Sequence, residues 1–289
     1  MATMKAIKKR ISSVNNTKKI MKAMDLVSAS KLQKAKSQLE DIRPLYENLQ
    51  TLMDGVKQSL SAVEHEDVPF TEDRDAKKAA YIVITSDRGL CGGYNVNAAK
   101  EALSKITSNK DREEKIIAVG AKGFEYFRRR GKNVAGKYPG PSEETTFEDA
   151  EDIGANVISM YASGEVDEVY LVYTHFETIL SHVPCSVKLL PVKPDPAAQA
   201  VPAGSAMEYD PDVGAFMAYA VPMYLNISIF GAMIESMVCE QAARMTSMDA
   251  AARNASEIID DLTLVYNRKR QNMITQEITE IVSGANALQ

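Results

Sequence analysis

The stretch IKKRISSVNNTKKIMKAMDLVSASKLQKAK, residues 7–36, opens a seven-residue repeat that decides the fold. Apolar side chains recur at two seam positions of each repeat as far as Val63, and fourteen of the seventeen seam positions are apolar. Such a repeat is typical of a helix, here roughly 85 Å long, that buries one narrow stripe against a partner helix. The seam consists of Ile7, Ile11, Val14, Lys18, Met21, Asp25, Ser28, Leu32, Ala35, Leu39, Ile42, Tyr46, Leu49, Met53, Val56, Leu60 and Val63.

Pro44 lies inside this repeat and has no N–H to donate to the helix. A proline in a helix interior removes one backbone hydrogen bond and kinks the chain. We therefore expect a bend or a short break near Arg43, after which the helix resumes.

A second repeat occupies the other end of the chain, and eleven of its thirteen seam positions are apolar. Neither Gly nor Pro occurs between Ala232 and Ser283, as an unbroken helix of about fourteen turns requires. Beyond Val265 the apolar residues move to a different face of the helix. The predicted seam consists of Met223, Ile227, Phe230, Ile234, Met237, Gln241, Arg244, Met248, Ala251, Ala255, Ile258, Leu262 and Val265.

The two helices are predicted to pair as a long antiparallel coiled coil. In that arrangement the polar seam residues Lys18, Asp25 and Ser28 lie opposite the far end of the second helix, where its apolar face changes. One end of the rod is then free, and a separate domain is inserted between the helices at the other end. A helical bundle is the alternative. The predicted parts are the helices 1–65 and 213–289, a linker 66–77, the inserted domain 78–192 and a loop 193–212.

Residues 213–234 carry no charge and are numerous enough to cross a bilayer. Pro222 and Asn226 weaken that interpretation, and the apolar stripe continues into charged repeats. We therefore favour a helix that packs on the inserted domain.

Short apolar runs alternate with amphipathic runs across residues 78–192, from AAYIVITS through KIIAVG and EVYLVYTHF to VPCSVKLLPV. This alternation predicts a small Rossmann-like α/β domain with a largely parallel sheet. SDRGLCGGYN, residues 86–95, follows the first strand, where such folds keep a phosphate loop. Its glycines form neither G-x-G-x-x-G nor a P-loop, so a structural turn with a partner contact is favoured over nucleotide binding.

Residues 1–36 hold ten Lys or Arg against one Asp, a net charge of +9 that leaves −14 for the remainder of a chain whose total is −5. A basic segment of this kind can be a solvated helix face, or it can bind nucleic acid or an acidic protein surface. Charge alone does not choose among these three.

Catalytic and metal-binding patterns are absent from the sequence. Cys91, Cys185 and Cys239 form no C-x-x-C pair, which fits a reducing compartment. The three histidines, His65, His175 and His182, form no metal-binding or nucleophile motif. The basic start lacks the apolar core of a secretory signal and is expected to belong to the mature protein. No catalytic residue, cofactor or metal is predicted.

Three ordered segments resemble the gamma subunit of F-type ATP synthases. They are residues 7–36, the loop 86–95 and ARMTSMDAAARNASEIIDDLTLVYNRKRQNMITQEITEIVSGANAL, residues 243–288. The likeness extends over nearly the whole chain, although Cys239 and the apolar VPMYLNISIFGAM depart from the family's usual pattern. No paired-cysteine insert like that of the chloroplast form is present, which favours a bacterial complex.

The resemblance implies that the chain is a non-catalytic rotor subunit in a central stalk. Such a rotor couples the flow of ions, here protons, through a membrane ring to ATP synthesis or hydrolysis. Its implied partners are a hexamer of alpha and beta subunits, a small epsilon subunit and the membrane c-ring. Its implied location is the cytoplasmic face of the bacterial plasma membrane, with which it associates only indirectly, through the complex. No nucleic-acid partner is implied. The residues implied to contact the beta subunit are Lys22, Met24, Arg88, Arg244, Arg270, Gln271, Thr275 and Glu277.

Two other functions remain as alternatives. A nucleotide-binding α/β protein would use the loop 86–95, and a basic coiled-coil adaptor for nucleic acid would use residues 5–36. Calorimetry with ATP and salt-dependent binding of duplex DNA would distinguish them.

Overall fold

The computed structural model describes residues 3–61, 70–71, 74, 76–109, 112–192 and 212–287. The chain divides into two compact units. The first, here called the rod unit, consists of Met1–Ala29 and Arg244–Gln289; the second, the sheet unit, is Ser30–Ala243. Helices α1 (Met4–Ser61) and α5 (Val213–Ala287) each contribute one segment to both units. Most of the predicted linker 66–77 and loop 193–212 lies outside the described residues.

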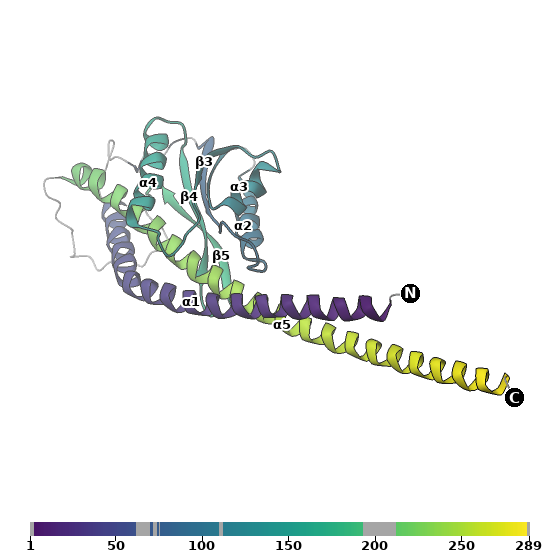
Figure 1. Ribbon diagram of the computed structural model, residues 1–289. Helices are drawn as coiled ribbons and strands as arrows, with labels where there is room; N and C mark the ends of the chain where they lie inside the picture. The colour runs from purple at the N-terminus through teal and green to yellow at the C-terminus, as the bar shows by residue number, and fades with distance from the viewer. Residues whose placement is uncertain are drawn as a thin grey trace. The chain divides into compact units, whose positions relative to one another are not determined.

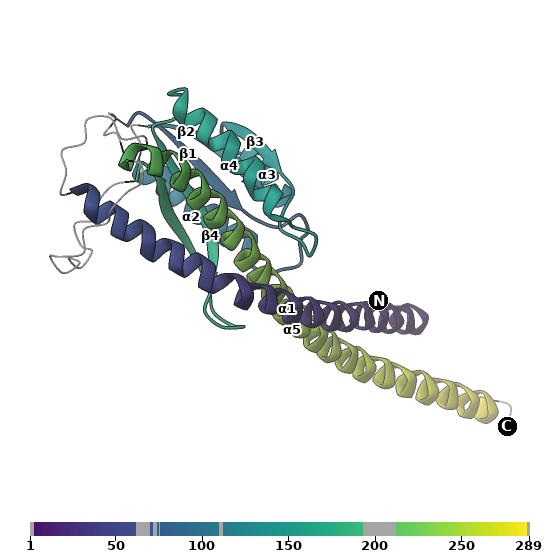
Figure 2. The same ribbon diagram turned by 90° about the vertical axis from the view of Figure 1, so that its left-hand side faces the viewer.

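In the rod unit, the segments of α1 and α5 form an antiparallel pair, with both chain ends on the same side (Figures 1 and 2). The predicted seam of α1 is buried or half-buried at every described position from Ile7 to Val56, although Leu60 and Val63 have no described side chains. The heptad assignment of α1 is therefore confirmed through Val56.

The predicted seam of α5 is wrong at alternate positions within the rod unit. Ile258 and Val265 are 44% and 46% exposed. Their sequence neighbours Ile259 and Tyr266 are half-buried instead. Apolar residues stand next to each other at these positions, so the hydrophobic pattern alone cannot choose which one faces α1. The seam in the structure runs through Met248, Ala252, Ala255, Ile259, Leu262, Tyr266 and Lys269.

In the sheet unit, α1 stays helical through Pro44, so the predicted alternative of a break is wrong. The helix bends in this part of its course instead (Figure 1). α1 and α5 also meet here, because a Cβ added to Gly231 would lie 3.3 Å from the ring of Tyr46.

The sheet unit is built on five strands in the order β3-β2-β1-β4-β5. β1, β2, β3 and β4 run parallel, and β5 pairs antiparallel to β4, so the prediction of a largely parallel sheet is confirmed. The sequence patterns did not predict the short edge strand β3. The strands are β1 (Lys78–Ile84), β2 (Glu113–Val119), β3 (Val134–Tyr138), β4 (Glu168–Phe176) and β5 (His182–Leu190).

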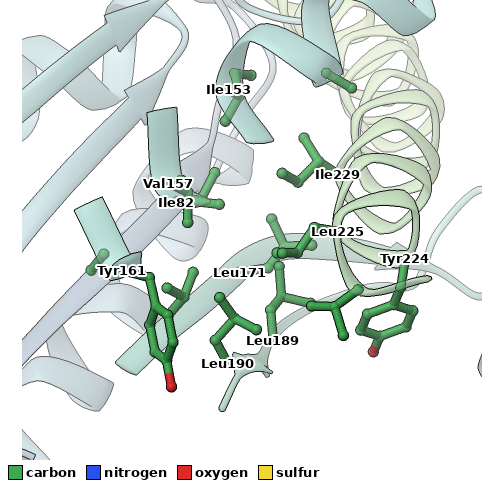
Figure 3. Packing of buried hydrophobic residues seen from close by; sticks show 14 of the residues in the cluster. Ile82, Ile153, Val157, Tyr161, Leu171, Leu189, Leu190, Tyr224, Leu225 and Ile229 are labelled. Carbon is green, nitrogen blue, oxygen red and sulfur yellow. The ribbon is translucent and has the colours of Figure 1, made fainter. Parts of the chain in front are cut away.

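Helices cover both faces of this sheet. α2 (Tyr94–Ser108) and α3 (Ala121–Arg128) pack on one face through Ala102 and Phe127. α4 (Phe147–Ala162), α5 and the end of α1 cover the other face. Figure 3 shows this second layer, where Val157 and Leu225 meet strand residues such as Leu171. Burial of apolar side chains from both sides is the main stabilisation of this layered architecture.

The packing between α4 and α5 depends on a glycine. A Cβ added to Gly154 would lie 1.9 Å from the Oδ1 atom of Asn226. α5 also contains an apolar window long enough to span a bilayer, but 67% of that window is buried within the protein. That burial is what a core helix shows, so the sequence preference for a packed helix agrees with the structure.

Candidate partner-binding surfaces

The loop between β1 and α2 presents Arg88 from a fixed backbone. Ser86 donates its N–H to Asn95 Oδ1 at 2.9 Å and its hydroxyl to the carbonyl of Arg88 at 2.6 Å. Asn95 donates to Cys91 Sγ at 3.1 Å. These bonds pin the loop at both of its ends, while the Arg88 side chain remains exposed.

Asp87 fixes the same loop to neighbouring segments. Its two carboxylate oxygens accept the N–H groups of Ala121, at 2.8 Å, and Gly140, at 3.1 Å. Between these anchors, Leu90 has a φ of 66° and is 61% exposed. The left-handed conformation costs a non-glycine residue about 1 kcal/mol or more. The loop therefore holds an apolar side chain in solvent at an energetic cost.

The crevice that open α/β sheets use for ligands is filled in this protein. The strand order reverses between β1 and β4, and such reversal points bind ligands at the carboxyl ends of the strands. Here Cys91, Tyr94, Cys239 and Ala243 form a buried apolar cluster against which Phe176 packs. Side chains thus occupy the position a nucleotide would take, which weighs against the nucleotide-binding alternative.

The histidine and cysteine side chains near this cluster have structural surroundings. His175 Nδ1 lies 2.8 Å from Glu235 Oε1, which also accepts the N–H of Phe176 at 3.1 Å. Burial raises the pKa of Glu235. Burial also raises the pKa of the Cys239 thiol, which donates to the carbonyl of Thr174 at 3.4 Å. A protonated, buried thiol is a poor nucleophile.

A buried ionic network lies at the opposite end of β4. Glu168 is 6% exposed and pairs with Arg112; its carboxylate also accepts from Lys188 Nζ at 2.7 Å and from the Tyr170 hydroxyl at 2.9 Å. A carboxylate with three donors is fully paired, as a buried charge must be. Among the described residues, no group of three His, Cys, Asp or Glu side chains could hold a metal ion.

The remaining predicted contact residues lie in the rod unit. Lys22 is exposed and Met24 half-buried on α1. Arg244 on α5 is 8% exposed, so most of its side chain is covered by the chain itself. Arg270, Gln271, Thr275 and Glu277 are all exposed, and Thr275 donates its hydroxyl to the carbonyl of Gln271 at 3.0 Å.

These last four residues belong to a segment of α5 that no other element covers. Every side chain from Arg270 to Asn286 is exposed, and we call residues 270–286 the bare segment. It contains Ile278 and Ile281, which are 57% and 71% exposed. In both views this end of α5 extends beyond the start of α1 (Figures 1 and 2). A solvent-exposed helix with large apolar side chains is typical of a protein-binding segment.

The ligand crevice of the sheet unit is filled, the loop after β1 presents an arginine to solvent, and the long helices have exposed surface. These features define a protein that binds other proteins and is built around two paired helices. The family model for ATP synthase matches residues 3–288. The ATP synthase gamma chain of Alkaliphilus metalliredigens (strain QYMF) is 43% identical over 289 residues, covering 99% of this chain and 98% of that one. The gamma chain of Desulforamulus reducens is 40% identical, with both chains fully covered. The chain therefore belongs to the ATP synthase gamma-chain family.

Solved structures show the same fold. The rotor of the Euglena gracilis mitochondrial ATP synthase matches with a TM-score of 0.64 at 14% identity, covering 94% of this chain and 98% of that chain. The central stalk and c-ring structure of the Tetrahymena thermophila mitochondrial ATP synthase contains a chain with a TM-score of 0.62 at 24% identity, covering 80% and 99%. The predicted combination of long terminal helices with an α/β domain is confirmed.

Proposed function

We propose that this chain is the central-stalk rotor subunit of a proton-driven ATP synthase. It couples ion flow through the membrane ring to ATP synthesis or hydrolysis at sites on the beta subunits, and it supplies no catalytic group itself. The proposed shaft consists of residues 1–65 and 213–289. The inserted domain consists of residues 78–192, and it is connected to the shaft by residues 66–77 and 193–212.

The bare segment is the observation that carries this proposal. A helix end whose every side chain is exposed contributes little to its own fold, yet residues 270–286 include several large apolar side chains. Family membership supplies the partner: a surrounding ring of larger subunits would cover these side chains. The residues of this segment that would then contact the beta subunit are Arg270, Gln271, Thr275 and Glu277. Arg244, which lies earlier in the same helix, would also contact beta.

The basic start of the chain gives the second proposed contact. Lys22 and Met24 on α1, and Arg88 on the sheet unit, would meet an acidic loop of beta. Diffuse charge complementarity of this kind steers association without fixing one position, which suits a surface that must slide. Because a single shaft offers each of three beta subunits a different face, identical subunits would hold different nucleotide affinities, and rotation would exchange them.

The remaining partners follow from family membership. The alpha and beta subunits would form a hexamer around the shaft, while the epsilon subunit and the membrane c-ring would bind the sheet unit. The protein would then be peripheral, at the cytoplasmic face of a bacterial plasma membrane, and would contact the bilayer only through the complex. The bacterial relatives support this location.

Affinity purification tests complex membership directly. A tagged chain expressed in its host should co-purify with a hexamer of larger ATPase subunits. Recovery of the tagged chain without them would refute the proposed function.

Substitution of Met24 tests the contact on α1. Met24→Lys adds a fixed charge to the face that is proposed to slide over an acidic loop, so the ratio of protons pumped to ATP hydrolysed should fall in membrane vesicles. Met24→Leu, which keeps an apolar side chain of similar volume, is the matched control. An unchanged ratio for Met24→Lys in assembled complexes would remove Met24 from the contact.

A further inference from the structure

A basic surface lies on the face of the sheet that α2 and α3 cover. The chain from Tyr94 to Tyr138, which includes α2, β2, α3 and β3, holds eleven Lys or Arg against five Asp or Glu. With every one of these carboxylates counted as charged, the segment has a net charge of +6, in a chain whose total is −5. The positive excess therefore does not depend on how the carboxylates are paired.

The excess is densest where α3 ends and β3 begins. Five of ten consecutive residues are Lys or Arg here, and none of the ten is Asp or Glu. β3 is the outer strand at its side of the sheet, and most of these cations are exposed. We call the five cations the arginine patch; they are Arg128, Arg129, Arg130, Lys132 and Lys137.

Carboxylates pair with only two of the five cations. Arg129 lies 3.9 Å from Glu125, a partner that it shares with Lys122. Lys132 lies 2.8 Å from Glu114. Within the part of the chain that the structure describes, the patch cations with no carboxylate at ion-pair distance are Arg128, Arg130 and Lys137.

These three cations are held against aromatic rings. The guanidinium of Arg130 lies 3.6 Å from the centre of the Tyr126 ring and donates to the Tyr126 carbonyl at 3.3 Å. Arg128 and Lys137 lie 5.4 Å and 4.8 Å from the centre of the Phe124 ring. The rings position the cations without neutralising them. Two like charges share one ring, and a bound anion would offset their repulsion.

The patch and the Arg88 loop lie at opposite ends of the parallel strands. α3 starts at the carboxyl ends, where the N–H of Ala121 donates to Asp87 of the Arg88 loop. It runs to the amino ends, because the chain next enters β3, which is parallel to β2 and β1. The proposed contact of Arg88 with beta therefore leaves residues 128–130 on the side away from beta, which is the side available to the membrane.

We infer that the arginine patch binds the phosphate groups of anionic phospholipids at the surface of the bilayer. Guanidinium groups pair with phosphate oxygens through two parallel hydrogen bonds, and clusters of about four to eight Lys or Arg attract anionic lipids. This inference rests on the proposed function, which makes the protein a peripheral rotor. It adds a direct lipid contact to an association that family membership alone makes indirect.

Rotation favours lipid over a stationary acidic protein as the occupant. The patch turns with the rotor relative to the bilayer. A fluid layer of headgroups presents the same charge at every angle, whereas a stationary protein would bind at one angle and impede the turn. Diffuse attraction between charges holds such a surface without fixing its position.

Vesicle flotation tests the chemistry of the patch. The assembled hexamer that contains this chain is mixed with vesicles of phosphatidylglycerol and phosphatidylcholine in equal parts, or of phosphatidylcholine alone. We expect it to bind the anionic vesicles only, with a partition coefficient that falls as salt is added. Equal binding to both kinds of vesicle would overturn the inference and leave the proposed function standing. Failure of the chain to assemble with a hexamer would overturn both.

A charge substitution assigns the binding to the patch. Arg128→Gln, Arg129→Gln and Arg130→Gln together should lower the partition coefficient on the order of 100-fold, because each cation near an anionic surface contributes about fivefold. The same three residues changed to Lys keep their charge and should retain most of the binding. The basic start of α1 is unchanged in every variant, so it does not account for a difference. Equal partition of the Gln variant and wild type would overturn the inference.

Photo-cross-linking in native membranes identifies the occupant. Benzoylphenylalanine at position 133 lies beside the patch and removes no cation, because Asn133 is exposed and uncharged. We expect phospholipid to be attached there. Position 96 is the matched control, since Val96 is 43% exposed on the same face but lies at the carboxyl ends of the strands, where no lipid is expected. Capture of protein or nucleic acid in place of phospholipid at position 133 would overturn the inference, and a captured ATP synthase subunit would leave the proposed function standing.

Discussion

α5 is one continuous helix with two very different segments. From Tyr224 to Ala243 every side chain is buried or half-buried, whereas the bare segment is exposed throughout. Both segments carry large aliphatic side chains, so composition does not explain the difference. What differs is whether the chain itself provides a partner. The first segment stabilises the sheet unit, and the second leaves its apolar surface exposed.

Truncating one side chain in each segment gives the largest contrast. Leu225 is fully buried against the sheet, so Leu225→Ala should lower the free energy of unfolding by about 2–5 kcal/mol. Ile278→Ala, in the bare segment, should change it by less than about 0.5 kcal/mol. Urea denaturation of the purified chain measures both values. A large loss from Ile278→Ala would show that the bare segment has a partner within the chain.

Within the sheet unit, two glycines allow steric clash and backbone strain to be separated. Gly120 has a φ of +102°, and an added Cβ would lie 2.2 Å from the carbonyl oxygen of Thr85. Gly131 has a φ of +66° with open space around it. Gly120→Ala should therefore cost about 2–4 kcal/mol, and Gly131→Ala about 1–2 kcal/mol. Thermal unfolding of both variants measures the difference, and equal losses would contradict the clash.

A smaller effect than at either glycine is expected at an ionic contact between α1 and the loop before α4. Glu143 lies 2.7 Å from Lys31 Nζ and 3.3 Å from Lys34 Nζ. Their hydrogen bonds lower the pKa of Glu143 below its ordinary value of 4.5. A lowered carboxyl pKa stabilises the folded state above pH 4.5, and this stabilisation is lost as the pH falls through the folded-state pKa.

Glu143→Gln should therefore lower the free energy of unfolding at pH 7 by less than about 1 kcal/mol, because the pair is partly exposed. The difference from wild type should shrink in acid and in high salt. Unfolding curves at several pH values measure it, with Glu151→Gln on the exposed face of α4 as the control. A difference that grows on acidification would reverse the assigned sign.

The sequence predicted the long helices well because their repeats are long and one-sided. At most of its seam, α1 has isolated apolar residues such as Val14 and Leu32, whose sequence neighbours are polar, so the choice of buried face was well defined. α5 has the adjacent pairs Ala251–Ala252 and Ile258–Ile259, for which two registers are equally apolar. The two members of each pair are identical, so the rotation of α5 about its axis relative to α1 decides between them, and a single sequence does not contain that information.

The sheet unit was less predictable at its edge and at its candidate site. β3 is a five-residue strand with alternating half-buried and exposed positions and an internal glycine, Gly136, so its hydrophobic signal is weak. The motif 86–95 correctly indicated a loop after β1, but nothing in it predicted that Phe176 and Cys239 fill the adjacent crevice. That contact joins residues far apart in the sequence.

The rod unit has a consequence for how the protein is made. It combines Met1–Ala29 with Arg244–Gln289, so the earlier of these two segments leaves the ribosome well before the segment with which it pairs. At about 5–20 residues per second, the delay is on the order of 10–40 s. During that time the seam of nascent α1, from Ile7 to Ser28, has no helix to cover it. Biosynthesis of this chain therefore exposes a basic, apolar-striped segment to chaperones before any shaft can exist.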